Sequence, residues 1–450
     1  MSGKVKVRAA ANADAMAGAM SVNERILRDC HSLYTDPETG LIALASHLGL
    51  TFLPPRKKIT VMLMGNHSAG KSSFINWYIE EHIQRTGVAI ETQGFAFITS
   101  GRKRESLTGD ATLHLYPHFK PLQSFQGVSE YLCTEISTSR QKKFSLVTFV
   151  DTPGLVDGDM KYPFDVNRAL LWLGELCDLV LVFFDPMGQA LCKRTLDIVE
   201  KVNENHGDKL RFFLSKADEA GGESDRQRVL MQIVQELCKR PGLNKCGFDM
   251  PTIYVPNPNK PSRCINQIED VCKTIEKTIT QTVQNTLNTL GRDSQKLTET
   301  IETRLREDEE TVWRNRRARV KGCLFGLSGF LLPVFLFASA LFGSISHEIW
   351  TSVLGKSGVE TLEIYLTPLL TLWSLVPEDY VGYTFLALAL LAVLLMLLAQ
   401  KCFRTHETLS KKQRRYLLDR HAYIGDVVAQ RQKKLYEDYL RQSVGDHDMS

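Results

Sequence analysis

Residues 61–73 combine glycines, a lysine and hydroxyl side chains at a spacing that suits phosphate binding. The segment G-N-H-S-A-G-K-S at 65–72 fits the pattern G-x-x-x-x-G-K-[ST], between an apolar run typical of a strand and a helical pattern. In such a loop, backbone N–H groups surround the phosphates, the lysine contacts the β and γ oxygens, and the hydroxyl binds Mg²⁺. A plain turn would need neither the lysine nor the strand. The predicted nucleotide-binding residues of this loop are Gly65, Asn66, His67, Ser68, Ala69, Gly70, Lys71, Ser72 and Ser73.

Two further polar motifs follow apolar runs. The motif D-T-P-G at 151–154 starts with an aspartate that can hold Mg²⁺, and the N–H of Gly154 can meet the γ-phosphate. In the motif S-K-A-D at 215–218, the Asp218 carboxylate can accept two N–H donors of guanine while the stem of Lys216 packs on the base. Lys216 and Asp218 could instead form a solvated surface pair.

Thr92 lies between the first two motifs, where a mobile loop that senses the nucleotide is expected. Its hydroxyl could bind Mg²⁺, and its carbonyl could hold the attacking water. A lone threonine in a loop is otherwise simply solvated. The predicted metal ligands are Ser72, Thr92 and Asp151, with Mg²⁺ as the cofactor.

Alternating apolar runs and polar helical segments over residues 59–256 indicate the elements that position these motifs. Buried strands are predicted at 59–64, 146–150, 179–184, 210–214 and 252–255. This alternation is typical of a doubly wound α/β sheet, in which ligands bind at the carboxyl ends of the strands. One or two short helices are predicted within residues 22–50, ahead of the first strand.

Composition excludes some classes of protein. The 450 residues leave room for about two to three domains, and a net charge of +4 makes no case for nucleic acid binding. The ten cysteines include no C-x-x-C pair, so neither a disulfide framework nor a zinc site is indicated and a reducing, cytosolic setting is expected. Residues 1–20 lack the apolar run of a signal peptide and are predicted to be a disordered tail.

Apolar residues at three- and four-residue steps over 263–319 predict an amphipathic helical stalk, interrupted at Gly291. Such a helix could act as a lever or as an oligomer seam, or it could pack only on its own nucleotide-binding domain.

Two apolar runs near the C-terminus are long enough to cross a bilayer. Residues 322–345 and 380–399 contain no charged side chain. Gly322 and Gly326 have the G-x-x-x-G spacing of close helix packing, and Pro333 predicts a kink in the first span.

Charge predicts the orientation of this hairpin. Basic clusters at 314–321 and 401–415 flank the two runs, whereas the linker between them is acidic, so both ends are expected in the cytosol. The stretch 359–377 contains Glu360 and Glu363, and its helical stripe suits an interfacial helix better than a third span.

The order of the motifs resembles the dynamin superfamily, and within it the sequence is similar to the EH-domain-containing (EHD) and sarcalumenin-like branch. The resemblance covers about residues 23–260. It rests on the stretches T-Q-G-F-A-F-I, L-T-G-D-A-T-L-H-L-Y-P, V-D-T-P-G-L-V-D-G-D, W-L-G-E-L-C-D-L-V-L-V-F-F-D-P and K-L-R-F-F-L-S-K-A-D.

The resemblance implies roles for individual residues. His67 occupies the position where dynamins carry a water-positioning glutamine, so the implied catalytic residues are Thr92, His67 and Gly154. Ser215 replaces the usual Asn or Thr, which weakens guanine selectivity, and the EHD branch uses ATP. The sequence shows no EF-hand loop near the C-terminus, so the EH domain is expected to be lacking.

The fold class predicted is α/β, a P-loop GTPase sheet with a helical stalk and a two-helix transmembrane hairpin. The function predicted is that of a membrane-anchored dynamin-like GTPase that couples GTP binding and hydrolysis to membrane remodelling. The alternative is a membrane-tethered switch or scaffold with slow hydrolysis, using ATP as EHD proteins do. Expected partners are GTP or ATP, the bilayer, and further copies of the chain through the G domain and stalk. The endoplasmic reticulum or another endomembrane is the favoured location, and the mitochondrial outer membrane is the alternative.

The predicted domains divide the chain into eight segments. They are a tail at 1–20, N-terminal helices at 21–56, a G domain at 57–260, a stalk at 261–320, a first span at 321–345, a lumenal linker at 346–379, a second span at 380–400 and a basic cytosolic tail at 401–450.

Overall fold

The computed structural model divides into two compact units, residues 1–295 with 426–450 and residues 296–425. The structure describes residues 20–87, 94–157, 162–187, 192–243, 250–259, 262–344 and 380–444, with single positions in the linker before residue 380. Predictions for residues 1–19, and most of those for the linker at 346–379, lie outside the described residues.

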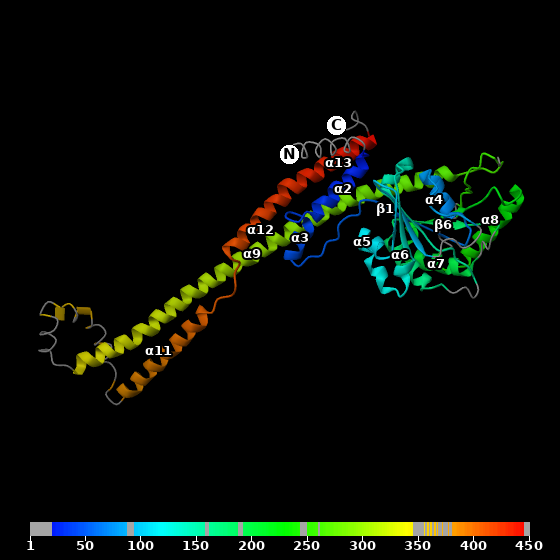
Figure 1. Cartoon of the computed structure of the whole chain (residues 1–450). Helices are drawn as coiled ribbons and strands as arrows, with labels where there is room; N and C mark the ends of the chain where they lie inside the picture. Colours follow the sequence, from blue (N-terminus) through cyan, green and yellow to red (C-terminus); the bar gives the residue numbers. More distant parts are fainter. Residues whose placement is uncertain are drawn as a thin grey trace. The chain divides into compact units, whose positions relative to one another are not determined.

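A seven-stranded sheet forms the centre of the first unit (Figure 1). Its strands are β1 (Ile59–Gly65), β2 (Phe95–Ser100), β3 (Glu105–Thr108), β4 (Leu132–Ser137), β5 (Val147–Asp151), β6 (Leu179–Phe184) and β7 (Leu210–Leu214). They lie in the order β3-β4-β2-β5-β1-β6-β7. The strands β5, β1, β6 and β7 are parallel, whereas β2 is antiparallel to β5 and β3 is antiparallel to β4. Parallel strands end at one edge, so β1, β5, β6 and β7 bring their carboxyl ends together.

Helices cover both faces of the sheet. They are α4 (Lys71–Ile79), α5 (Asp110–Leu115), α6 (Val166–Leu176), α7 (Lys193–His206) and α8 (Glu223–Cys238). Met62 and Met64 of β1 belong to the core cluster that includes the buried side chains of α6 and α7. On the other face, the ring of Phe74 in α4 meets Phe149 and Phe183 edge-on. This arrangement confirms the predicted doubly wound α/β fold, and β1 is buried along its whole length as a central strand must be.

The strand predicted at 252–255 is wrong. Thr252 forms only an isolated bridge to Leu214. Pro251 and Pro256 flank the segment, and because a proline has no N–H the ladder cannot extend in either direction. The sheet gains β2, β3 and β4 instead, which the strand prediction did not include. The predicted N-terminal helices are confirmed as α2 (Val22–Thr35) and α3 (Leu41–His47).

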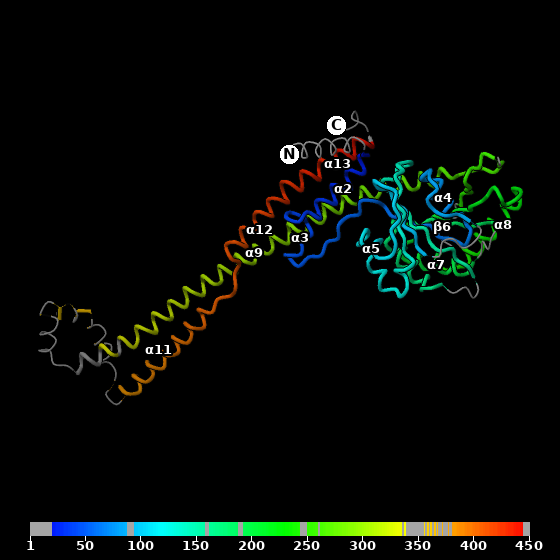
Figure 2. The backbone as a smooth tube through the Cα atoms, in the orientation of Figure 1, coloured from blue at the N-terminus to red at the C-terminus, as the bar shows by residue number. Residues whose placement is uncertain are grey.

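Three helices pack together at the side of the first unit (Figure 2). They are α2, the beginning of α9 (Ile268–Ser344) and α13 (Ala429–Val444). Tyr34 of α2 donates a hydrogen bond of 2.6 Å to Asp293 of α9, and Arg25 of α2 pairs with Asp438 of α13 at 3.0 Å. The buried stripe Ile279, Val283, Leu287 and Leu290 of α9 is the predicted apolar face.

The interruption predicted at Gly291 is wrong, because α9 is helical through this position. A Cβ atom at Gly291 would lie 2.5 Å from the side-chain nitrogen of Gln432 in α13. The glycine therefore allows α13 to approach and does not end the helix.

The second unit contains the remainder of α9, α11 (Val381–Phe403) and α12 (Lys411–Tyr423). Asn315 of α9 exchanges two hydrogen bonds with the backbone of His406, at 2.8 and 3.0 Å. Ser410 and Gln413 form a capping box that starts α12. α9 is also helical on both sides of Pro333.

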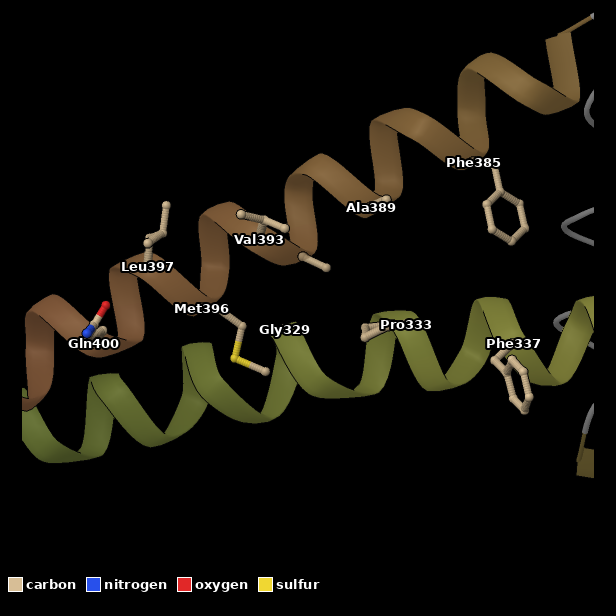
Figure 3. A pocket seen from close by; sticks show the side chains of 10 residues that line it. Gly329, Pro333, Phe337, Phe385, Ala389, Val393, Met396, Leu397 and Gln400 are labelled. Carbon is tan, nitrogen blue, oxygen red and sulfur yellow. The ribbon is translucent and has the colours of Figure 1, made fainter.

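α9 and α11 lie side by side in this unit (Figure 3). Cβ atoms at Gly326 and Gly329 would lie 3.7 Å from Ala399 and 3.2 Å from Leu395 of α11, as expected for glycines at a helix contact. Among the described residues, α11 is the one helix with the length and composition to cross a membrane, with a mean hydropathy of 2.6. A groove of about 750 Å³ between the helices is lined by apolar side chains and Gln400.

Candidate nucleotide-binding site

The loop between β1 and α4 needs glycine at two positions. Gly65 has φ 154°, and a Cβ atom there would lie 2.4 Å from the carbonyl oxygen of Phe183 in β6. Gly70 has φ 82° and stands at the start of α4, so the loop turns in the left-handed region directly before the helix. The predicted strand, loop and helix are therefore confirmed. The first N–H groups of α4 lie next to the loop, and the N-terminus of a helix attracts anions.

Lys71 is buried, with 6% of its surface exposed. Its Nζ atom donates to the carbonyl oxygens of Gly65 and Asn66, at 3.3 and 3.0 Å. Burial lowers the pKa of Lys71, and the charge of Asp151 opposes this shift. The ammonium group is thus held inside the loop, where a phosphate would replace its weak carbonyl contacts with anionic oxygens.

Asp151 ends β5 and is fully buried beside the start of α4. Ser72 Oγ donates a hydrogen bond of 2.5 Å to its Oδ2 atom. Its Oδ1 atom is buried without a hydrogen-bond partner among the described residues. Burial raises the pKa of Asp151, while the charge of Lys71, the hydroxyl of Ser72 and the backbone N–H of Thr152 act in the opposite direction.

Ser72 and Asp151 together fit the ligands of a Mg²⁺ ion. Mg²⁺ prefers oxygen ligands and is usually bound by one or two carboxylates together with phosphate oxygens. The Ser72 hydroxyl and the unpartnered Asp151 oxygen supply such donors next to the phosphate loop. Thr92, the third predicted ligand, lies outside the described residues.

The D-T-P-G segment is tied to the phosphate loop by backbone contacts. The N–H of Leu155 donates to Gly65 at 3.2 Å, and the N–H of His67 donates to Leu155 at 3.1 Å. A Cβ atom at Gly154 would lie 2.7 Å from the Cα of His67, so only glycine allows the two segments to approach this closely. The structure therefore brings together Gly154 and His67, which the sequence resemblance had placed in catalytic roles.

The S-K-A-D segment follows β7 and reaches the same loop. Lys216 has φ 49°, and its Cγ atom lies 4.0 Å from the position of a Cβ atom on Gly70. Its Nζ atom pairs with Asp185 at 3.4 Å, so the lysine stem is held beside the phosphate loop. Asp218 is half-buried two residues further on.

Sequence reasoning missed three polar residues around the site. Asp185 follows β6 directly, and a carboxylate after a buried strand was the available signal. Thr195 of α7 donates a hydrogen bond of 2.6 Å to the side chain of Asn66. Asp157 accepts from the N–H groups of Lys193 and Arg194 and so caps α7. These contacts link α7 to both loops and depend on pairings between distant residues.

Comparison with known families gives the class of this domain. Residues 60–216 match the family described as 50S ribosome-binding GTPase. The sheet, the phosphate loop and the Ser72–Asp151 pair agree with this match. Together they define a P-loop GTPase domain, a module of the nucleoside triphosphate hydrolases.

The relatives of the domain are more specific. It is 29% identical over 168 residues to EH domain-containing protein 1 of Arabidopsis thaliana, covering 36% of this chain and 30% of that protein. It is 27% identical over 171 residues to human EH domain-containing protein 3, covering 36% of this chain and 31% of that protein. The domain is therefore similar to the EH domain-containing proteins, although the match spans less than a third of the length of these relatives.

Among solved structures, a bacterial dynamin from an oligomerised pair matches with a TM-score of 0.41 at 12% identity. The match covers 94% of this chain and 79% of that chain.

Proposed function

We propose that this chain is a membrane-anchored, dynamin-like GTPase that couples GTP binding and hydrolysis to membrane remodelling. The observation that carries the nucleotide part is the contact of Ser72 with Asp151, which leaves one buried carboxylate oxygen unpartnered beside Lys71. Burying an unpartnered carboxylate oxygen costs stability, so this arrangement is best explained by a ligand that completes it.

Each residue of the loop has a role in this proposal. Lys71 exchanges its two carbonyl contacts for the β and γ oxygens, and the N–H groups of residues 68–73 surround the phosphates. Ser72 and Asp151 would hold Mg²⁺, with Thr92, which lies outside the described residues, as the third proposed ligand. The ion would balance the negative charge of the phosphate oxygens.

The hydrolysis step uses the close contact between the two loops. The N–H of Gly154 orients toward the γ-phosphate, and His67 together with the carbonyl of Thr92 positions the attacking water. Tyr162 donates a hydrogen bond of 2.7 Å to the carbonyl of Gly154, which fixes the orientation of the following peptide. The loop would therefore change its contacts when the γ-phosphate leaves.

Guanine recognition is assigned to the S-K-A-D segment. The stem of Lys216, held by Asp185, packs on the base, and Asp218 accepts its two N–H donors. Ser215 instead uses its hydroxyl for the carbonyl of Phe184, at 3.1 Å, so it adds no contact to the base.

The membrane anchor in this proposal is a helical hairpin. The apolar end of α9 forms the first span, at 321–345, and α11 forms the second, at 380–400. Large apolar side chains of both helices are exposed, which a soluble helix pair would bury. At the open end of the hairpin, the guanidinium groups of Arg316 and Arg317 lie over the ring of Trp313. At the other end, the rings of Tyr380 and Tyr383 lie next to each other. Aromatic residues at both ends of an apolar segment are typical of membrane interfaces.

The basic flanks support a cytosolic position for the G domain and for the tail at 401–450, and an endomembrane such as the endoplasmic reticulum is the proposed location. Helices α2, α9 and α13 would transmit changes in the G domain to the hairpin, and further copies of the chain would assemble through the G domain and stalk. The contact of Lys143, next to β5, with Glu276 of α9 at 3.2 Å supports this route.

Imaging of vesicles tests the proposal. The purified full chain is reconstituted into liposomes and examined by electron microscopy with GTP, with GDP and with a non-hydrolysable GTP analogue. A remodeller changes vesicle shape in a way that depends on the nucleotide. If vesicles keep their shape in all three states while GTP is bound, the chain is a tethered switch and the remodelling function is wrong.

A further inference from the structure

Two cysteines of the second unit stand at the same level of the helix pair. A Cβ atom at Gly322 of α9 would lie 3.3 Å from the Cβ of Cys402 in α11, so Cys402 lies against the turn that carries Cys323. Cys323 is exposed and Cys402 is partly exposed, and both are free thiols. The two thiols therefore lie on neighbouring helices, at the same height along the helix pair, and both can be reached from solvent.

The surroundings of the pair mark a boundary between charged and apolar residues. Arg319 and Lys321 lie within four residues before Cys323, and Lys401 and Arg404 flank Cys402. The first apolar run continues directly after Cys323, and the second ends at Ala399, three residues before Cys402. In the proposed hairpin this boundary is the level of the cytosolic headgroups, where long basic side chains reach the interface.

The cysteines of the first unit differ from this pair. Cys30, Cys177, Cys192, Cys264 and Cys272 are buried, and Cys133 is partly exposed but lies in β4 of the G domain. Cys238 at the end of α8 is exposed, but its helix belongs to the G domain and has no apolar run beside it. Among the described cysteines, Cys323 and Cys402 are the two that are accessible and also lie next to a proposed membrane span.

We propose that Cys323 and Cys402 are S-acylated by long-chain acyl groups, a modification that rests on the membrane hairpin of the proposed function. The donor is a long-chain acyl-coenzyme A. The Sγ thiolate attacks the thioester carbonyl, a new S–C bond forms at the cysteine, and the bond to coenzyme A breaks. The coenzyme A thiolate leaves and takes up the proton released by the cysteine, so no oxidant or reductant is needed.

The groove between the two helices offers room for an attached chain. It reaches Gln400, two residues before Cys402, and runs past Gly329 and Pro333 to Phe385 (Figure 3). Its volume of about 750 Å³ lies within the range of ligand sites, roughly 300–1,000 Å³. An acyl chain on Cys402 would fill apolar space that the two helices leave open.

Acyl exchange on the full chain expressed in cells tests the proposal. Free thiols are blocked, thioesters are cleaved with hydroxylamine, and the thiols released are tagged with a polyethylene glycol maleimide. The wild type should gain two mass steps, Cys323→Ser and Cys402→Ser one step each, and the double variant none. Cys238→Ser is the matched control and should keep both steps. A wild type without hydroxylamine-dependent steps, or steps that survive in the double variant, would overturn the assignment.

Membrane integration is measured on the same samples by extraction with alkaline carbonate. A chain that resists extraction but shows no mass step refutes the acylation and leaves the hairpin standing. A chain that is extracted refutes the hairpin. The serine substitutions are close in volume to cysteine, so the double variant should resist extraction as the wild type does.

Discussion

Gly154 and His67 belong to different segments, yet a Cβ atom on the first would lie 2.7 Å from the Cα of the second. This contact joins the loop after β5 to the phosphate loop after β1. The N–H of His67 donates to Leu155 in the same region, so backbone groups help to align the two loops. Substitution at the glycine should therefore separate the loops.

Gly154→Ala is expected to lower the rate of GTP hydrolysis more than it weakens GTP binding. The added methyl group has no room, and overpacking of this kind costs about 1–3 kcal/mol. Steady-state turnover and the binding of a fluorescent GTP analogue measure the two effects. Gly425→Ala is the control, since nothing lies within 4 Å of a Cβ atom there. Unchanged turnover in Gly154→Ala would show that the contact between the loops is not needed.

Asp151→Asn is expected to stabilise the nucleotide-free chain at neutral pH. Because burial raises the pKa of Asp151 in the folded state, the unfolded chain binds fewer protons, and stability falls as the pH rises from about 4 through the raised pKa. The asparagine does not titrate, so its advantage over the wild type should grow across this range. Thermal unfolding at several pH values measures it.

The same variant should lose the stabilisation that Mg²⁺ with GTP gives the wild type. Asp178→Asn is the contrasting control, because both oxygens of Asp178 have partners, Arg56 and the N–H of Thr60, each at 2.8 Å. That variant should lose about 1–3 kcal/mol of stability. If Asp151→Asn were destabilised as well, the unpartnered carboxylate would not be a site kept for a ligand.

Asp218→Asn is expected to weaken GTP binding by about 5- to 150-fold, corresponding to about 1–3 kcal/mol for a bidentate contact to a base, and to leave ATP binding unchanged. Competition titrations with GTP and ATP measure this selectivity. Glu219→Gln, at the exposed neighbouring residue, should bind both nucleotides as the wild type does. Equal losses for GTP and ATP, or no loss, would contradict guanine recognition by Asp218 and favour the use of ATP.

Local patterns predicted the site because its requirements are local. The glycines at 65 and 70 are needed for the backbone of one loop, and the apolar runs before Gly65, Asp151 and Ser215 do form β1, β5 and β7. Contacts between distant residues could not be predicted in this way. Asp185 follows an apolar run, but its ion pair with Lys216 forms only in the folded chain. Gly291 suggests a helix end until Gln432 of α13 approaches it.

The strands β3 and β4 were missed for a related reason, whereas β2 begins with an apolar run at 95–98 that a strand prediction could have used. β3 is exposed along most of its length and gains its place by pairing with β4 in antiparallel register. β4 alternates between buried and partly exposed residues, so it lacks the continuous apolar run used to identify the central strands. Their positions follow from pairing across the sheet, which a single strand's sequence does not encode.

The central claim is that one chain carries a GTPase site and a membrane anchor that act together. GTP turnover per molecule of the full chain is measured in detergent and in liposomes at increasing protein density, with Lys71→Ala as the inactive reference. We predict that turnover rises in liposomes and rises further with density, because neighbouring G domains meet on the bilayer. Equal turnover in detergent and in liposomes at every density would contradict the coupling of GTP hydrolysis to the membrane.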